Sequence, residues 1–197
     1  MPAPADPIAL FARSFERARR NPAADAADPT AVCLATADAQ GRPSARMVLL
    51  KGFDRRGFVF YTNYASRKAH ELAANPQAAL CFYWPAIGEQ IRVEGAVEKV
   101  SPEESDAYWV SRDRASQLGA WASRQSEPLS SRSRLLGRLV KAEARFAAGP
   151  VPRPPFWGGF RLIPERIEIW RSRLHRLHER TLYSRDGEGW TRERRYL

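Results

Sequence analysis

"ARMVLLKGFDRRGFVFYTN", residues 45–63, contains two short apolar runs separated by the polar turn "DRRG". Both runs are rich in aliphatic and aromatic residues and have the length of ordinary strands. A short polar turn ending in glycine is typical of the connection between two antiparallel strands. The stretch therefore predicts a hairpin with strands over 45–53 and 57–63.

Similar signals recur along the chain. In "EQIRVEGAVEKV", residues 89–100, Ile91 and Val93 alternate with Arg92 and Glu94, the pattern of a half-exposed strand. Further strands are predicted over 30–38, 78–84 and 157–170, with two more on either side of the turn "RDGEG" after residue 181. Capping residues, prolines and glycines predict helices after Asp6, from Ser66 to about Asn75, after Ser101, over 115–123 and over 130–148.

These elements favour one domain over residues 1–197, with residues 1–6 loose. Hairpin turns outnumber crossovers, and no internal repeat or linker is visible. We therefore predict a mainly β protein with flanking helices (α+β). Its six to eight mostly antiparallel strands would form a closed or nearly closed barrel.

The composition narrows the classes of function. Hydrophobic residues make up 44% of the 197 residues, so the chain should fold around a core. The net charge is +10, and arginine supplies all but four of the 32 basic residues. Such a charge suits a polyanion or a phosphate-rich ligand, and arginine makes two-pronged contacts with phosphate. The alternative is that much of the charge is an ordinary solvated surface.

Other features point to a cytoplasmic protein. Cys33 and Cys81 lie in apolar runs without the spacing of a zinc or redox motif, as expected for thiols in a reducing compartment. No secretory signal is visible, and the longest apolar run, residues 78–84, is too short to span a membrane. No phosphate-binding glycine loop and no metal-ligand spacing appears.

"RSRLHRLHER", residues 171–180, is the densest block of positive charge. If residues 174–183 are extended, Arg176, His178 and Arg180 share one face, because side chains alternate with a period of two. That arrangement gives a convergent cationic surface for an anion. The competing interpretation is a basic edge strand that discourages aggregation.

Two more clusters suit phosphate. In "YTNYASRKAH", residues 61–70, Ser66, Arg67 and Lys68 begin a helix, and helix N-termini attract anions. In "YWVSRDRASQ", residues 108–117, Tyr108, Arg112 and Ser116 recur every four residues and would line one helical face. Each cluster also has an interpretation without a ligand. The first would be an ordinary capped helix, and the second a solvated helical face.

Together the motifs are specific. "RMVLLK", "FYTNYASRKAHEL", "QIRVEG", "YWVSRDRASQLGAWASRQS", "FWGGFRL" and "RLHERTLY" occur in an order and spacing that resemble the pyridoxine/pyridoxamine 5′-phosphate oxidases. The resemblance covers nearly the whole chain. It implies a homodimeric, FMN-binding split β-barrel with its FMN sites at the subunit interface. It also implies oxidation of pyridoxine 5′-phosphate and pyridoxamine 5′-phosphate to pyridoxal 5′-phosphate, with hydride transfer from C4′ to flavin N5. Oxygen would be reduced to hydrogen peroxide, and the amine substrate would release ammonia.

The resemblance also assigns residues to FMN. Arg46, Arg67 and Lys68 suit its phosphate, and Gln125 and Ser126 match contacts made from the other subunit. The full set that matches FMN contacts is Arg46, Met47, Val48, Leu49, Leu50, Lys51, Tyr61, Thr62, Arg67, Lys68, Gln90, Gln125, Ser126, Trp170 and Arg180.

For the substrate, the resemblance implies a phosphate grip made by Lys51, Tyr108, Arg112 and Ser116. Arg176 and His178 match residues beside the pyridine ring, and they are the predicted catalytic residues. FMN and substrate each bring a phosphate of about −1.5 to −2 charge, so a site for both needs several cations. In "RSRLH", residues 171–175, the chain departs from the family's glycine-rich approach to this motif, and we expect a different loop there.

Three alternatives remain at this stage. One is a sibling flavin oxidase on the same fold, such as a phenazine-pathway enzyme, which has no need of a second phosphate grip. Another is a flavin-binding or storage protein without turnover. The last, a nucleic-acid-binding protein that uses the positive charge, predicts an affinity that falls steeply with salt. The resemblance favours the oxidase, with no nucleic acid and no membrane as partners.

Overall fold

The computed structural model describes residues 6–21 and 28–196. The prediction that residues 1–6 are loose therefore lies outside the described residues, except at Asp6. The Asp6 carboxylate caps the first helix by accepting a hydrogen bond from the backbone N–H of Ile8. None of the helices in these two segments is long and apolar enough to cross a membrane.

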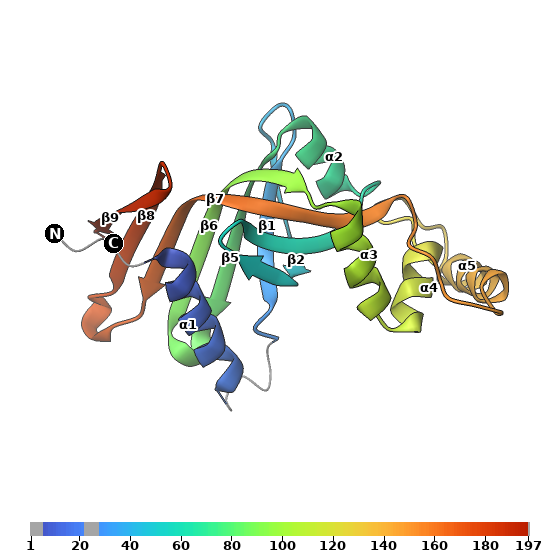
Figure 1. The fold of residues 1–197 in the computed structure, drawn as a ribbon, viewed down its shortest axis with the longest axis horizontal. Helices are drawn as coiled ribbons and strands as arrows, with labels where there is room; N and C mark the ends of the chain where they lie inside the picture. The colour runs from blue at the N-terminus through green and yellow to red at the C-terminus, as the bar shows by residue number, and fades with distance from the viewer. Residues whose placement is uncertain (1–5, 22–27, 197) are drawn as a thin grey trace.

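One curled antiparallel sheet forms the body of the protein (Figure 1). In chain order its strands are β1 (Ala31–Ala37), β2 (Pro43–Leu49), β3 (Gly52–Asp54), β4 (Gly57–Asn63), β5 (Gln77–Trp84), β6 (Glu89–Lys99), β7 (Trp157–Arg171), β8 (Glu179–Asp186) and β9 (Gly189–Arg195). The path runs β2-β1-β5-β6-β7-β4-β3, with β8 on β7 and β9 on β8.

Strand β7 connects the two ends of this sheet. One of its edges pairs with β6 along most of its length. Its other edge pairs first with β4, from Phe58 opposite Leu162 to Asn63 opposite Trp157. Beyond that point the same edge pairs with β8, from Arg166 opposite Ser184 to Arg171 opposite Glu179. The sheet therefore splits at β7 and curls into a half-barrel.

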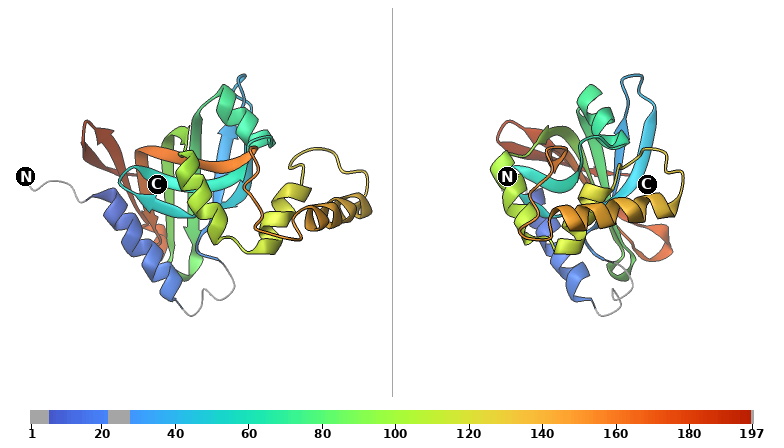
Figure 2. Two further views of the ribbon diagram at one scale, coloured as in Figure 1. Left: turned by 45° about the vertical axis from the view of Figure 1, so that its right-hand side comes forward. Right: turned by 90° about the vertical axis from the view of Figure 1, so that its right-hand side faces the viewer.

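Within residues 6–21 and 28–196, five α-helices and two short 3-10 turns flank the sheet. They are α1 (Pro7–Arg20), α2 (Arg67–Ala74), η2 (Pro85–Ile87), α3 (Pro102–Ser111), α4 (Arg114–Ala122), α5 (Arg132–Arg145) and η3 (Leu174–Arg176). Helices α4 and α5 lie at one end of the molecule and β8 and β9 at the other, in Figure 1 and in the left-hand view of Figure 2.

The main core lies between the sheet and α1. Phe11 is fully buried, and its ring lies 4.8–4.9 Å from the rings of Phe53, Phe58 and Phe82. Edge-to-face contacts of this kind add to the burial of apolar area. A second, smaller core lies beneath α3, α4 and α5, where Trp109 packs against Trp157. The two cores give the sheet a rigid support at both ends.

The structure refines the strand prediction in one place. The run 45–53 is broken after Leu49, so that the sheet has nine strands in the described residues and not six to eight. The break occurs because the backbone N–H of Leu50 donates to Thr30, just before β1, whereas that of Lys51 donates to Val59 of β4. The hairpin with its turn at 54–57 and the mainly antiparallel character are confirmed.

We expect Phe11→Ala to lower the free energy of unfolding by about 3–5 kcal/mol, because it leaves a cavity among aromatic rings. Urea unfolding followed by tryptophan fluorescence measures the change. Arg13→Ala, at an exposed position of the same helix, should change it by less than about 0.5 kcal/mol. Equal effects of the two substitutions would contradict the role of Phe11.

Candidate active site

A cavity of about 720 Å³ opens beside β2, the start of α2 and the α3–α4 region. It collects many of the residues that the sequence singled out. These are Arg46, Met47, Val48, Leu49, Lys51, Tyr61, Thr62, Arg67, Lys68, Tyr108, Arg112, Ser116, Gln125 and Ser126. The cavity is therefore bordered by five cations that come from separate parts of the chain.

Lys68 lies at the buried side of this cavity, with 7% of its surface exposed. Its Nζ donates to Thr62 Oγ1 at 3.1 Å and to Gln125 Oε1 at 3.2 Å. Burial, reinforced by the charge of Arg46, lowers the pKa of Lys68 to about 8 although Glu71 opposes the shift. An anion in the cavity would favour the charged form of this lysine.

Glu71 of α2 supports the cavity wall from behind. Its Oε1 accepts from Arg67 Nε at 2.8 Å, and its Oε2 accepts from a terminal nitrogen of Arg46 at 3.2 Å. The hydroxyls of Thr36 and Ser44 also donate to Oε2. Burial alone would raise the pKa of Glu71, but the hydrogen bonds from Ser44, Thr36 and Arg67 and the charge of Arg46 lower it to about 2.

An aromatic wall forms another side of the cavity. The rings of Tyr61 and Tyr108 are stacked with their centroids 4.0 Å apart, and Trp157 lies parallel to both. The guanidinium of Arg112 lies over Trp157 at 4.9 Å, within the range of a cation–π interaction. This packing holds Arg112 and Tyr108 at the same side of the cavity.

The spacing predicted that Tyr108, Arg112 and Ser116 lie on one helical face. In the structure they do not. Helix α3 ends at Ser111, and Asp113 caps α4 by accepting from the backbone N–H of Ser116 at 2.8 Å. The prediction was wrong about the helix because an aspartate in this position starts a new one. The three residues nevertheless line the same cavity, from the end of α3, the joint and the start of α4.

Two other assignments change with the structure. Leu50 is buried in the main core and does not line the cavity. Gln125 and Ser126, which were expected to act from the other subunit, line the cavity of their own chain. Ser126 Oγ accepts from the backbone N–H of Arg67, so the two residues close the cavity over the start of α2.

A second cluster contains the remaining predicted residues and lies outside this cavity. Trp170 of β7 is opposite Gln90 on one side and Arg180 on the other. The rings of Trp170 and His178 lie with their centroids 4.8 Å apart. Arg180 donates to Glu168 at 2.8 Å, and this hydrogen bond raises the pKa of the arginine.

The prediction that residues 174–183 are extended was wrong at its start. Arg171 pairs with Glu179, so the residues between them must form the connection of a hairpin. Residues 174–176 form the turn η3, in which His175 and Arg176 have φ angles of 56° and 60°. Such left-handed conformations are uncommon for residues other than glycine and concentrate at functional sites.

This connection is held by its own polar contacts. Arg173 donates to both carboxylate oxygens of Glu179, at 3.1 and 2.9 Å, and its backbone N–H donates to His178 Nδ1 at 3.0 Å. Arg171 donates to the buried Glu89 at 2.8 Å. Two arginines of the 171–180 block that had no predicted role therefore stabilise the connection, while the Arg176 side chain is exposed.

Met47, at the edge of the cavity, shares one face of the sheet with the second cluster. Met47 lines the cavity and is opposite Cys33; Cys33 is opposite Cys81, and Cys81 is opposite Arg92. Arg92 in turn is opposite Glu168, the partner of Arg180. Directly opposed residues share a face, and four strand spacings of 4.7–4.9 Å put Met47 about 20 Å from Glu168.

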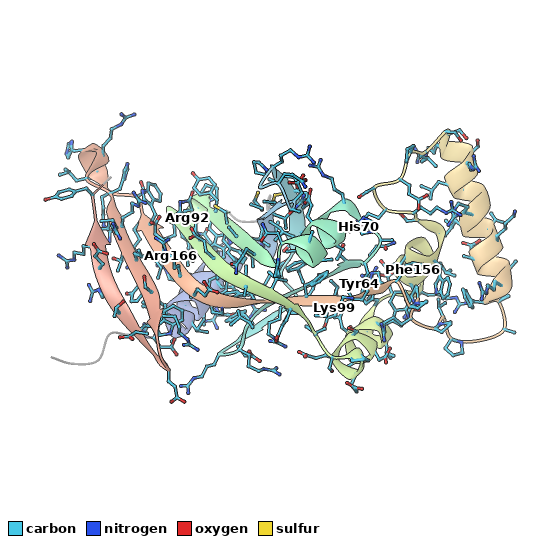
Figure 3. All side chains as sticks on the ribbon, turned by 90° about the horizontal axis from the view of Figure 1, so that it is seen from above. Tyr64, His70, Arg92, Lys99, Phe156 and Arg166 are labelled. Atoms are coloured by element: carbon cyan, nitrogen blue, oxygen red, sulfur yellow. The ribbon has the colours of Figure 1, made fainter. Side chains whose placement is uncertain are left out.

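Figure 3 shows the molecule from above. Arg92 and Arg166 lie together on neighbouring strands, whereas Tyr64 and Phe156 lie toward the end that carries α4 and α5. The backbone N–H of Tyr64 donates to Phe156, which fixes the end of β4 beside the segment that enters β7. Three strands, β1, β5 and β6, separate β2 from β7 along the sheet.

The sequence patterns missed several residues of the site. Trp157 lines the cavity and packs on both tyrosines, but an isolated tryptophan before two glycines gives no signal of such a role. The sequence patterns also did not predict Glu71 and Glu168, which bind arginines of the cavity and of the second cluster. The spacing of Arg67 and Glu71, four residues apart in a predicted helix, was a usable signal for an ion pair.

Comparisons with known proteins agree with this architecture. The family model described as "Pyridoxamine 5'-phosphate oxidase" matches residues 22–145. A second model, described as "Pyridoxine 5'-phosphate oxidase C-terminal dimerisation region", matches residues 157–196. Together the two models cover most of the chain, including both clusters.

Several relatives are similar over almost their whole length. A protein of Rubrobacter xylanophilus named pyridoxine/pyridoxamine 5′-phosphate oxidase is 60% identical over 189 residues, covering 96% of this chain and 86% of its own. A protein of the same name from Myxococcus xanthus is 55% identical over 193 residues, covering 98% and 92%.

Solved structures show the same fold. PhzG from Burkholderia lata, in complex with tetrahydrophenazine-1-carboxylic acid, has a TM-score of 0.91 at 34% identity, covering 98% of this chain and 94% of its own. A structure from Nostoc punctiforme, described as a pyridoxamine 5′-phosphate oxidase-related, FMN binding protein, has a TM-score of 0.76 at 22% identity and covers 96% of both chains.

The half-barrel and these relatives put the chain in the class of split-barrel oxidoreductases, and the predicted fold is confirmed. Within that class, the chain belongs to the pyridoxamine 5′-phosphate oxidase family. The prediction that it is an enzyme is confirmed as well, and the family model over residues 157–196 marks a dimerisation region.

We expect the Lys68 side chain to titrate near pH 8, charged below that value and neutral above it. With only four lysines in the chain, ¹³C-lysine NMR resolves the signal, and Lys68→Met identifies it. Inorganic phosphate should move the midpoint upward, because an anion favours the ammonium form. A midpoint that phosphate leaves unchanged would contradict an anion site beside Lys68.

Proposed function

We propose that the protein uses FMN to oxidise pyridoxine 5′-phosphate and pyridoxamine 5′-phosphate to pyridoxal 5′-phosphate, with oxygen as the final acceptor. Ammonia is released from the amine substrate, and oxygen becomes hydrogen peroxide. The observation that carries the proposal is the cavity, which offers two separate groups of phosphate-binding side chains. The names of the relatives at 53–60% identity support the same substrates.

The residues of the cavity fit FMN. Arg46, Arg67 and Lys68 lie together at the start of α2, as a phosphate dianion requires. The buried Lys68, with its lowered pKa, is a cation whose charge lacks a direct carboxylate partner among the described residues. The backbone and side chains of β2 from Arg46 to Leu49 extend from this group along the cavity, where a ring system would lie.

The second group suits the phosphate of the substrate. Lys51, Tyr108, Arg112 and Ser116 line the same cavity, and Trp157 fixes Arg112 by its cation–π contact. One phosphate of about −1.5 to −2 charge at each group accounts for the five cations of the cavity. An oxidase whose substrate lacks a phosphate has no need of the second group.

The catalytic residues come from the second cluster. Because His178 Nδ1 accepts from the backbone of Arg173, Nε2 carries the proton of the neutral ring and is the atom free to donate to the substrate. Arg176 presents a planar guanidinium, which stacks on an aromatic ring. Its backbone is left-handed, and its side chain is exposed.

The complete site then requires two chains. The face between the two clusters has small side chains at its centre, among them Cys33 and Cys81, and an exposed Met47 at its edge. A two-fold axis through this centre brings the cavity edge of one chain onto the cluster edge of its partner, which is the self-complementary geometry of an isologous dimer. The matched dimerisation region contains the strands that carry the second cluster.

In this arrangement the protein binds and orients, and the cofactor does the redox chemistry. Bound FMN would supply the redox chemistry, in which its N5 would take a hydride from the substrate C4′ and oxygen would reoxidise it. The cavity cations hold both phosphates, so that the two rings are kept at reacting distance. Arg176 covers the outer face of the substrate ring and excludes water, and His178 orients the polar edge of that ring.

A sibling flavin oxidase is the second candidate, because PhzG has the same fold at 34% identity. The two candidates share the cofactor and differ in the substrate. The four-residue grip formed by Lys51, Tyr108, Arg112 and Ser116 favours a phosphorylated substrate.

We expect the FMN-loaded protein to lose its visible flavin absorption band when pyridoxine 5′-phosphate is added without oxygen, and to regain it in air. Anaerobic absorption spectroscopy measures both half-reactions. The same experiment with pyridoxine, which lacks the phosphate, is the control and should bleach far more slowly. A protein that stays yellow with both phosphorylated substrates but is bleached by a dihydrophenazine carboxylate would favour the sibling oxidase.

We expect Arg112→Ala and Arg176→Ala each to abolish most turnover, Arg176→Ala while FMN stays bound. If one site uses Arg112 of one chain and Arg176 of its partner, a re-associated equal mixture should recover about a quarter of the wild-type activity, because half the dimers contain one intact site. Steady-state peroxide formation measures the recovery. No recovery, with subunit exchange verified by a mass tag, would put each complete site within a single chain.

A further inference from the structure

Glu71 is an unexpected carboxylate for a region that should attract phosphate. It is 5% exposed and lies on α2, one turn after Arg67 and Lys68. It does not line the cavity, so it has no direct access to an anion there. A buried carboxylate beside an anion site would repel the ligand unless it has another effect that outweighs the repulsion.

Its contacts reveal that effect. One oxygen of Glu71 binds Arg67 of its own helix, and the other binds Arg46 of β2, so that a single carboxylate holds two arginines from different elements. Two hydroxyl groups also link Arg46 to Glu71 indirectly. Arg46 donates to Thr36 and Ser44, and both hydroxyls donate onward to Glu71.

The arrangement also sets the charge of the subsite. Arg46, Arg67 and Lys68 with Glu71 leave a net charge of about +2, which matches a phosphate that carries about −1.5 to −2. Without Glu71, the three cations would lie close together and repel one another. The side chains of Arg46 and Arg67 would also have several rotamers available. Fixing such side chains before the ligand arrives lowers the entropic cost of binding.

We propose that Glu71 is a positioning residue that orients Arg46 and Arg67 for the phosphate of the cofactor and thereby makes the protein select FMN over riboflavin. The inference rests on the proposed use of FMN. Glu71 acts only through the two arginines, since its oxygens are occupied by Arg46, Arg67, Thr36 and Ser44.

The test compares FMN with riboflavin, which has the same ring system and no phosphate. Apo-protein is titrated with each flavin, and the quenching of flavin fluorescence gives both dissociation constants. We expect Glu71→Ala to weaken FMN binding by about tenfold or more, the scale of lost charge-assisted hydrogen bonds, and riboflavin binding by less than about twofold. Glu71→Gln, which keeps the shape and one acceptor oxygen, should recover part of the loss.

Two control variants are titrated with the same two flavins. Glu143→Ala removes an exposed glutamate of α5 and should leave both affinities unchanged. Arg67→Ala removes one of the oriented arginines and should reduce the preference for FMN in the same way as Glu71→Ala. Thermal unfolding of each variant verifies that α2 still packs on the sheet.

The outcomes separate the inference from the proposed function. An unchanged ratio of the two affinities in both Glu71 variants, or an equal loss for both flavins, would overturn the inference and leave the use of FMN intact. A wild-type protein that binds FMN no better than riboflavin would overturn both. A selective loss of FMN affinity, smaller in Glu71→Gln, is the result expected.

Discussion

The antiparallel pairing of β7 with three other strands is the constraint on which the molecule depends. Its first half, next to β4, carries the aromatic wall of the cavity through Trp157. Its second half, next to β8, carries Trp170 and Glu168 of the second cluster. Since β6 pairs along most of its other edge, neither half can shift without the other. One continuous strand thereby carries both the aromatic wall of the cavity and part of the second cluster.

A common device recurs at both ends of this sheet. Each cluster places a nearly buried glutamate beneath arginines: Glu71 binds Arg46 and Arg67, and Glu168 binds Arg180 and lies near Arg92. An arginine that is held on one side by a carboxylate still has donors free on its other side, because the guanidinium has five N–H groups. The protein can therefore place several cations close together, because the glutamates reduce the repulsion between them.

Much of this was predictable from local patterns, and the failures have physical reasons. The Asp6 and Ser101 caps are in place, and the alternation of residues 89–97 matches their burial. The spacing of Tyr108, Arg112 and Ser116 correctly grouped three residues that line one cavity. It wrongly placed them on one helix, since Asp113 caps a new helix. Residues 174–183 were predicted as extended because alternation says nothing of the pairing of Arg171 with Glu179, which turns the chain between these two residues. Glu71 holds Arg46 across 25 residues, a distance that no local pattern covers.

The separation of the cavity from the second cluster has a consequence for how the enzyme becomes active in the proposed arrangement. A newly made chain has a cavity for the flavin but not the residues that cover the substrate, which its partner must supply. In the proposed arrangement, the folding of one chain therefore does not complete a site, and turnover requires two chains to associate. Dilution below the dissociation constant of the pair would lower the activity per chain, and peroxide is made only where enough protein has accumulated to assemble.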